Sequence, residues 1–308
     1  MPSPLPPRIW IITEGMAGTE NQCLGITDAM GIIPIVHRIG LRQPWKLLSP
    51  YLGMECAASF TPSLPTPPWP DILITSGRKS IAASRYIKKQ SHGKTFTVQI
   101  QDPRISPKNF DLVVVPHHDP TRGDNVFVSI ATPNRISAER LAKAKIDFAP
   151  LFGQTSTQPR IAVLIDGSTK RHTFTQDDTQ NLITALAPIP NMMITTSRRT
   201  GDTNARMIRD AFGSRHYIWD GLSPNPYMGL LAWADIILVT ADSTSMVSEA
   251  ATTGKPVYVI LMAGLTPRQT QLIENLKAHG AVRDYPAEGK SSLTSWTYPP
   301  LHDAQDIA

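Results

Sequence analysis

The sequence predicts an α/β protein made of two Rossmann-like domains that face each other across a cleft. Two observations lead to this fold class. Short β-rich runs alternate with stretches of helical length and composition, which is typical of a parallel sheet covered on both faces. The alternation also starts afresh near residue 160 of the 308 residues. A chain of this length holds two domains at about 100 to 200 residues each.

The first half contains predicted strands at residues 9–13, 33–39, 71–75, 95–100, 111–116 and 125–130. Helices are expected from Glu20 to Met30 and from Lys79 to Gln90, and Gly31 is a suitable C-cap for the first helix. The proline-dense run TPSLPTPPWP (61–70) excludes a helix or a central strand. It predicts an extended surface loop.

The second half contains predicted strands at residues 160–165, 191–196, 215–219, 235–240 and 256–261. The segment 148–160 is rich in Pro, Thr, Ser and Gly and has no clear periodicity, so it is the expected linker. We therefore expect an N-terminal Rossmann-like domain at 1–152 and a C-terminal Rossmann-like domain at 153–308.

Composition excludes several classes of protein. Apolar residues make up 41% and charged residues 18%, which excludes a wholly disordered chain. Cys23 and Cys56 are too few for a disulfide scaffold and lack the paired spacing of a zinc site. No apolar run approaches the roughly 18 residues that cross a bilayer, and the start MPSPLPPR has no signal-peptide core. A cytoplasmic protein is expected.

Positive charge is concentrated in the first half. Residues 1–154 hold 17 Lys and Arg against 11 Asp and Glu, a net charge of +6, whereas residues 155–308 hold 13 against 14, a net charge of −1. This excess suits an anionic membrane or an anionic substrate, and the alternative is a merely solvated face. No nucleic-acid motif occurs, so a nucleic-acid partner is not expected.

Functional residues are expected in the loops that follow strands, because ligands of open parallel sheets bind beyond the carboxyl ends of the strands. The first loop offers Glu14 or Glu20 as a general base. The acceptor-side candidates are Gly15, Gly18, Asn21 and Gln22 in this loop and His117 and His118 after the fifth strand. The alternatives are a tight turn capped by Thr19 and an ordinary surface turn at the histidines.

The second half offers donor-side candidates at three strand ends. Gly167 and Ser168 supply an amide and a hydroxyl. In the next loop, the guanidinium groups of Arg198 and Arg199, which follow Ser197, can hold a diphosphate, and the alternative is that they are solvated. Residues 235–251 form a buried strand that runs into a hydroxyl-rich helix start, where Asp242 or Ser243 can cap the helix and the other N-terminal amides favour an anion. Its candidates are Asp242, Ser243, Thr244, Ser245 and Glu249, the last of which suits a ribose or sugar hydroxyl.

No His, Cys or carboxylate array has metal-ligand spacing, and Asp177-Asp178 is interpreted as a helix start. We therefore expect no metal and no cofactor other than a nucleotide-sugar co-substrate.

Several stretches together resemble a family named for the plant elongated-mitochondria fission factor and shared with many bacterial proteins. The stretches are GMAGTENQCLG, PDILITSGRKS, VQIQDPR, FDLVVVPHHD, TSRRTGD, NPYMGLLAWADIILVTADSTSMVSEAATTGKPVYV and YPPLHDAQDIA. The resemblance implies a GT-B-like fold with the acceptor or membrane side in the first domain and the nucleotide-sugar donor in the second. One departure is Asp166-Gly167, where the family often has a Gly pair.

The function implied is metal-independent transfer of a sugar from a nucleotide-sugar to a lipid-linked or envelope glycan acceptor, at the inner face of the membrane. The alternatives are another nucleotide-dependent enzyme and a non-catalytic membrane adaptor, since plant members recruit a dynamin-related protein to the mitochondrial outer membrane. The closing motif implies that the tail returns to the first domain and controls closure. Pro299 and Pro300 would stiffen it, Leu301 would anchor it, and Asp303 and Asp306 would meet the basic domain.

Overall fold

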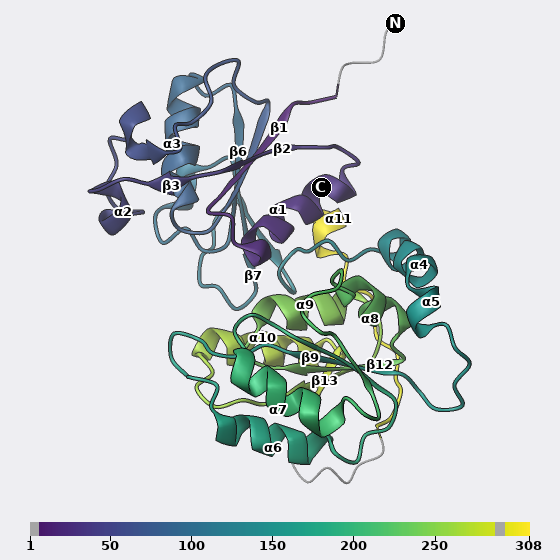
Figure 1. The fold of residues 1–308 in the computed structure, drawn as a ribbon. Helices are drawn as coiled ribbons and strands as arrows, with labels where there is room; N and C mark the ends of the chain where they lie inside the picture. The colour runs from purple at the N-terminus through teal and green to yellow at the C-terminus, as the bar shows by residue number, and fades with distance from the viewer. Residues whose placement is uncertain (1–5, 287–292) are drawn as a thin grey trace, which may run out of the picture. The chain divides into compact units, whose positions relative to one another are not determined.

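The computed structural model describes residues 6–286 and 293–308, which form two compact units (Figure 1). Unit 1 contains the residues up to Arg135 together with His302–Ala308, and unit 2 contains Ile136–Leu301. The boundary therefore precedes the expected one at 152/153. The reason is that α4 (Ala138–Asp147) packs against α8 (Tyr227–Trp233), where the indole Nε1 of Trp233 donates to the carbonyl of Lys145 at 3.0 Å.

Unit 1 is built on a six-stranded parallel sheet in the order β2-β1-β5-β6-β7-β8. All six predicted strands are present: β1 (Ile9–Thr13), β2 (Ile35–Arg38), β5 (Ile72–Ser76), β6 (Phe96–Ile100), β7 (Leu112–Pro116) and β8 (Val126–Ser129). The helices α1 (Ala17–Ala29) and α3 (Ser80–Gln90) bury apolar residues against this sheet. Met30 is the C-cap of α1, and Gly31 follows it with a φ of +69°, a conformation that favours glycine.

The segment between β2 and β5 is shaped by a small antiparallel pair, β3 (Gly40–Leu41) with β4 (Phe60–Thr61). Between them lie α2 (Trp45–Leu48) and a 3-10 turn, η1 (Ala57–Ser59). The sequence did not predict these strands because two residues carry no periodicity. Residues 62–71 contain no helix or strand, so the predicted proline-rich loop is confirmed.

Unit 2 is built on a second six-stranded parallel sheet, in the order β11-β10-β9-β12-β13-β14. The five predicted strands are β9 (Ile161–Ile165), β10 (Met192–Thr196), β11 (Tyr217–Ile218), β12 (Ile236–Thr240) and β13 (Val257–Ile260). The edge strand β14 (Val282–Asp284) was missed because only Val282 is buried there. The remaining helices are α5 (Ala149–Phe152), α6 (Gln176–Leu186), α7 (Asp202–Phe212), α9 (Thr244–Thr252) and α10 (Pro267–Ala278).

Each sheet has one point at which the strand order reverses direction. In unit 1 this switch point lies between β1 and β5, and in unit 2 it lies between β9 and β12. The loops that leave two adjacent strands in opposite directions open a crevice there, where ligands of such folds bind. The first loop of each half therefore lies at the switch point of its own sheet.

The end of the chain packs inside unit 1. The helix α11 (Asp303–Ile307) lies against α1, as Figure 1 shows, and Ile307 packs on the cluster around Ile9 and Ile11. The carboxylate of Asp303 accepts hydrogen bonds from the amides of Ile130 (2.8 Å) and Ala131 (3.1 Å). Across residues 6–286 and 293–308, no helix combines the length and apolarity needed to span a membrane.

Candidate functional site

The switch point of unit 2 is organised around the carboxylate of Asp166, which is 2% exposed at the end of β9. Its Oδ1 accepts from the hydroxyl of Ser197 (2.7 Å) and from Nε of Arg199 (2.9 Å), and its Oδ2 accepts from a terminal nitrogen of Arg199. The guanidinium of Arg199 is thus committed to a carboxylate inside the protein. It fixes the loop after β10 against the loop after β9.

Gly167 allows these two loops to touch. A Cβ at this position would lie 2.2 Å from the carbonyl oxygen of Arg199, so no other residue fits the observed backbone. The amide of Ser168 donates to that same carbonyl at 2.9 Å. The position next to Asp166 therefore serves close backbone packing.

Asp242 joins the loop after β12 to the same network. Its Oδ2 accepts from the amide of Gly167 at 2.6 Å, which ties the two sides of the switch point together. Burial raises the pKa of the Asp242 carboxyl, and the neighbouring Asp166 carboxylate raises it further. Ser243 caps α9 by accepting from the amide of Met246, as one of the two predicted caps requires, while Thr244 and Ser245 begin the first turn.

Glu249 lies one turn into α9 and is half-buried. Its Oε2 accepts a hydrogen bond of 2.6 Å from the hydroxyl of Tyr227, at the start of α8. Burial raises the pKa of Glu249 to about 7, although the bond from Tyr227 opposes the shift. Burial, followed by the Glu249 charge, raises the pKa of Tyr227 well above its usual range, so Tyr227 remains the donor of this pair.

Exposed cations surround this edge of unit 2. Arg198, Lys170 and Arg171 are exposed, and the guanidinium of Arg198 contacts no partner within the described residues. Of the two adjacent arginines, Arg198 is therefore the one available to an anion. The first turn of α10 also reaches this edge, since the side-chain amide of Gln269 donates to the carbonyl of Asp242 at 2.8 Å.

The carboxylates of the first loop in unit 1 are both ion-paired. Glu14 pairs with Lys79 across the switch point, from the end of β1 to the start of α3. Glu20 accepts two bonds from Arg38, at 2.8 and 2.7 Å, and these bonds lower its pKa. The two predicted bases thus differ in their partners, because Glu20 accepts two hydrogen bonds from a guanidinium, whereas Glu14 pairs with a single ammonium.

The other acceptor-side candidates have mixed roles in unit 1. Gly15 has a φ of +83°, and Gly18 and Asn21 are partly exposed on α1. Gln22 is 5% exposed, and its carbonyl oxygen accepts from Ser76 and Gln101, both at 3.0 Å. Gln22 therefore ties α1 to the ends of β5 and β6, which is a scaffold contact.

His117 and His118 follow β7 in a turn whose backbone is pinned on both sides. The amide of His117 donates to Ser129, and its carbonyl accepts from Arg122 at 3.0 Å. His117 is exposed and His118 is half-buried. These contacts position the turn between the ends of β7 and β8.

Sequence reasoning did not select Tyr227 or Gln269. Tyr227 stands in the NPYMGLLAW stretch, 22 residues ahead of Glu249, and only the folded chain brings the two together. Among the described residues no group of three His, Cys, Asp or Glu side chains has an arrangement that suits a metal ion. The expectation of a metal-independent site stays a prediction.

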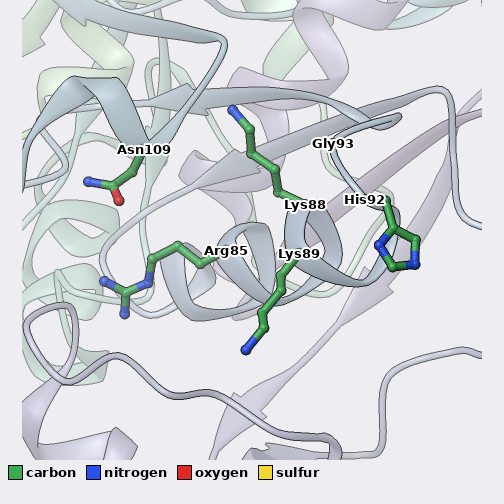
Figure 2. A pocket seen from close by; sticks show the side chains of 6 residues that line it. All are labelled: Arg85, Lys88, Lys89, His92, Gly93 and Asn109. Atoms are coloured by element: carbon green, nitrogen blue, oxygen red, sulfur yellow. The ribbon is translucent and has the colours of Figure 1, made fainter.

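A separate hollow of about 410 Å³ lies on α3, outside this site (Figure 2). It is lined by Arg85, Lys88, Lys89, His92, Gly93 and Asn109. Because α3 runs back along the sheet from the end of β5, its second half lies toward the amino ends of the strands. The hollow is therefore distant from the switch-point loops of unit 1.

Solved structures with the same fold include a MurG from Acinetobacter baumannii, with a TM-score of 0.52 and 11% identity over 93% of this chain and 88% of that one. A UDP-GlcNAc 2-epimerase from Neisseria meningitidis, solved bound to UDP-GlcNAc, has a TM-score of 0.54 and 13% identity over 91% of this chain and 88% of that one. These likenesses show a GT-B-like fold, as predicted.

Two relatives are similar in sequence. The mitochondrial fission protein ELM1 of Arabidopsis thaliana is 33% identical over 267 residues, which are 78% of this chain and 62% of that protein, so the chain spans under two thirds of its length. The uncharacterized protein RP120 of Rickettsia prowazekii is 26% identical over 98% of this chain and 96% of its own. The family model described as mitochondrial fission ELM1 matches residues 17–308. The chain belongs to the mitochondrial fission ELM1 family.

Proposed function

We propose that this chain is a metal-independent glycosyltransferase that binds a nucleotide-sugar at the switch point of unit 2. The observation that carries the proposal is the Tyr227–Glu249 pair one turn beyond the start of α9, on a GT-B-like fold. A carboxylate held by a phenol at that place suits a sugar or ribose hydroxyl. An ordinary helix-surface Glu has no such partner.

The start of α9 would receive the diphosphate. The first amides of a helix have no partner inside the helix, and the helix dipole favours negative charge there. Ser243 uses one amide, that of Met246, so the amides of Thr244 and Ser245 remain for a ligand. Arg198 would add a charge-assisted contact, while Arg199 would keep Asp166 neutralised.

The base would be Glu14 in unit 1. An acceptor hydroxyl must lose a proton as the anomeric carbon leaves the diphosphate, so the base needs an accessible carboxylate. Glu20 is disfavoured because two bonds from Arg38 lower its pKa. Glu14 is held by one ion pair, with Lys79, and both side chains are partly exposed. The acceptor would be a lipid-linked or envelope glycan at the inner face of the membrane.

A non-catalytic adaptor is the second candidate. It is favoured by the 33% identity to a plant protein named for mitochondrial fission, since that name describes a cellular process and no transfer reaction. An adaptor needs only its outer surface. It gives no reason for a half-buried carboxylate that accepts a hydrogen bond from a phenol at a switch point.

Calorimetry of the full chain against UDP, GDP, CMP and ADP sugars tests the proposal. We expect one nucleotide base to bind, and we expect Glu249→Gln to bind it more weakly. If no nucleotide-sugar binds, the glycosyltransferase proposal is rejected and the adaptor is retained. If a nucleotide-sugar binds but no free nucleotide is released when membrane extract is added, the proposed sugar transfer is rejected and the proposed binding site is retained.

A further inference from the structure

A short segment of unit 1 exposes four large apolar side chains that the proposed function does not use. Leu47, Leu48, Tyr51 and Met54 are 73%, 46%, 69% and 84% exposed, and all lie within eight residues of one another. We call these four side chains the apolar tip. Apolar residues scattered singly need no explanation, but a group rimmed by polar residues marks an interaction surface.

The segment that carries the apolar tip is firmly held. The guanidinium of Arg85, on α3, donates to the carbonyls of Pro50 (2.7 Å) and Leu52 (2.9 Å) and pairs with Glu55. The indole of Trp45 packs against the core of unit 1 and donates to the carbonyl of Gly53 at 3.2 Å. The apolar tip is therefore presented outward by a fixed backbone.

The chain around the apolar tip is cationic. Residues 42–54 hold Arg42 and Lys46 and no acid, and residues 78–94 hold six Lys and Arg and no acid. Within the described residues, three acids pair with these cations: Glu14 with Lys79, Glu55 with Arg85, and Asp111 with Lys88 at 2.8 Å. Lys46 and Lys89 are exposed and make no ion pair in the described parts of the chain.

The hollow on α3 adjoins this segment through Arg85, which lines the hollow and also bonds to the backbone of residues 50–52. Figure 2 shows the basic side chains of Arg85, Lys88, Lys89 and His92 spread around the second half of α3. A cationic hollow beside an exposed apolar group matches the two layers of a bilayer surface, which are phosphate headgroups and acyl chains.

We propose that the apolar tip and the neighbouring cations dock this chain on the surface of an anionic phospholipid bilayer. The apolar side chains would enter the headgroup boundary, and Lys46, Lys89 and the hollow would meet lipid phosphates. A protein partner fits less well, because a stable protein interface covers about 800 Å² per partner and four side chains fall short of that area. This inference does not depend on sugar transfer.

Sedimentation of the full chain tests the surface, with vesicles of phosphatidylcholine alone and of phosphatidylcholine with phosphatidylglycerol. We expect binding to the anionic vesicles that weakens as salt is raised. Each cation is worth about five-fold in binding, so Lys46→Ala with Lys89→Ala should weaken it roughly twenty-five-fold. The triple variant Leu47→Ser, Tyr51→Ser, Met54→Ser should lose at least about ten-fold. Equal sedimentation of parent and variants would overturn the proposal.

A matched control separates the apolar tip from apolar exposure in general. Leu222, in unit 2, is 92% exposed, so Leu222→Ser should bind vesicles as the parent does. Fluorescence gives a second measurement that needs no loss of function. A tryptophan at Leu47→Trp should shift to the blue with anionic vesicles, while one at Leu222→Trp should not. Equal shifts at both positions, or no shift at Leu47→Trp, would reject the bilayer as the partner and leave a protein surface.

Discussion

The two units place acidic side chains at equivalent points of similar sheets but hold them differently. In unit 2, Asp166 is almost fully buried and is satisfied by Arg199 and Ser197. In unit 1, Glu14 and Glu20 pair with Lys79 and Arg38 in places that solvent still reaches. A buried carboxylate acts as a structural tie, because removing its partner leaves an uncompensated charge in a medium of low polarity.

The carboxylates at the two switch points therefore have different surroundings: those of unit 2 are buried and join loops, whereas those of unit 1 remain accessible to solvent. In unit 2, Asp166 and Asp242 hold three loops together, and under the proposed function the start of α9 and Glu249 would bind the ligand. Unit 1 keeps its carboxylates near solvent, where a proton can be exchanged. Mutations at equivalent positions of the two units should therefore have unequal effects.

The largest difference in stability is expected between variants that break the Asp166–Arg199 ion pair and the Glu14–Lys79 ion pair. Arg199→Ala leaves Asp166 buried without its cation and should lower the free energy of unfolding by about 3 to 5 kcal/mol. Lys79→Ala leaves Glu14 partly exposed and should cost no more than about 1 kcal/mol. Scanning calorimetry of both variants measures the contrast. Similar losses of stability in the two would mean that the burial of Asp166 has no energetic consequence.

The second-largest difference in stability is expected between substitutions of Gly167 and Gly15, the glycines that follow the first strand of each sheet. Gly167→Ala places a methyl group against the Arg199 carbonyl and should cost roughly 3 kcal/mol, since backbone must move. Gly15→Ala meets the flexible side chain of Arg38 at 3.2 Å and should cost about 1 kcal/mol for its positive φ. Urea unfolding of the two variants is the measurement. A larger cost at Gly15 would show that backbone conformation outweighs close packing here.

Glu249 should make stability depend on pH. Its pKa is raised to about 7 from 4.5, so the folded state binds its proton more tightly. The contribution is complete below pH 4.5 and is lost as pH rises through about 7. Glu249→Gln should thus be more stable than the parent at pH 8, by about 1 to 3 kcal/mol, and equal to it at pH 4.5. A pH-independent difference would argue against the raised pKa.

The smallest effect is expected for the exposed arginines, and it concerns ligand binding only. Arg198→Ala should weaken the nucleotide-sugar identified by calorimetry by about 1 kcal/mol, or roughly five-fold, because its charge lies near solvent. Arg78→Ala, an exposed arginine in the loop after β5 of unit 1, serves as the control and should change nothing. Thermal stability should be unchanged in both. Unaltered affinity in Arg198→Ala would remove this residue from the proposed donor site.

The sequence predicted the elements that carry continuous buried runs and missed those that depend on single residues. β1 and β9 are buried at every position, so composition alone marks them. β14 and the β3–β4 pair have too few buried residues to leave a pattern. The domain boundary was misplaced because the contact of α4 with α8 joins distant parts of the chain.

The candidate site was predicted at the level of loops. The rule that ligands bind beyond strand ends selected the positions of Ser243 and Glu249, and the cap at Ser243 is confirmed. The partners were beyond prediction, because Arg199 meets Asp166 across 33 residues and Tyr227 meets Glu249 across 22. The ion pair with Asp166 occupies Arg199 and leaves Arg198 available to an anion. The spacing of residues along the chain does not predict which loops lie next to each other in the folded protein.

Unit 1 is discontinuous in the chain, and this affects how it can be synthesised and dissected. Residues 302–308 leave the ribosome only after all of unit 2, so the contacts of Asp303 with Ile130 and Ala131 form after both sheets have been translated. Unit 2 can be cut out as one continuous piece, whereas unit 1 needs its last helix joined back to it. A genetic fragment that stops at Arg135 would leave the α1 surface under α11 uncovered, which invites aggregation of the nascent domain.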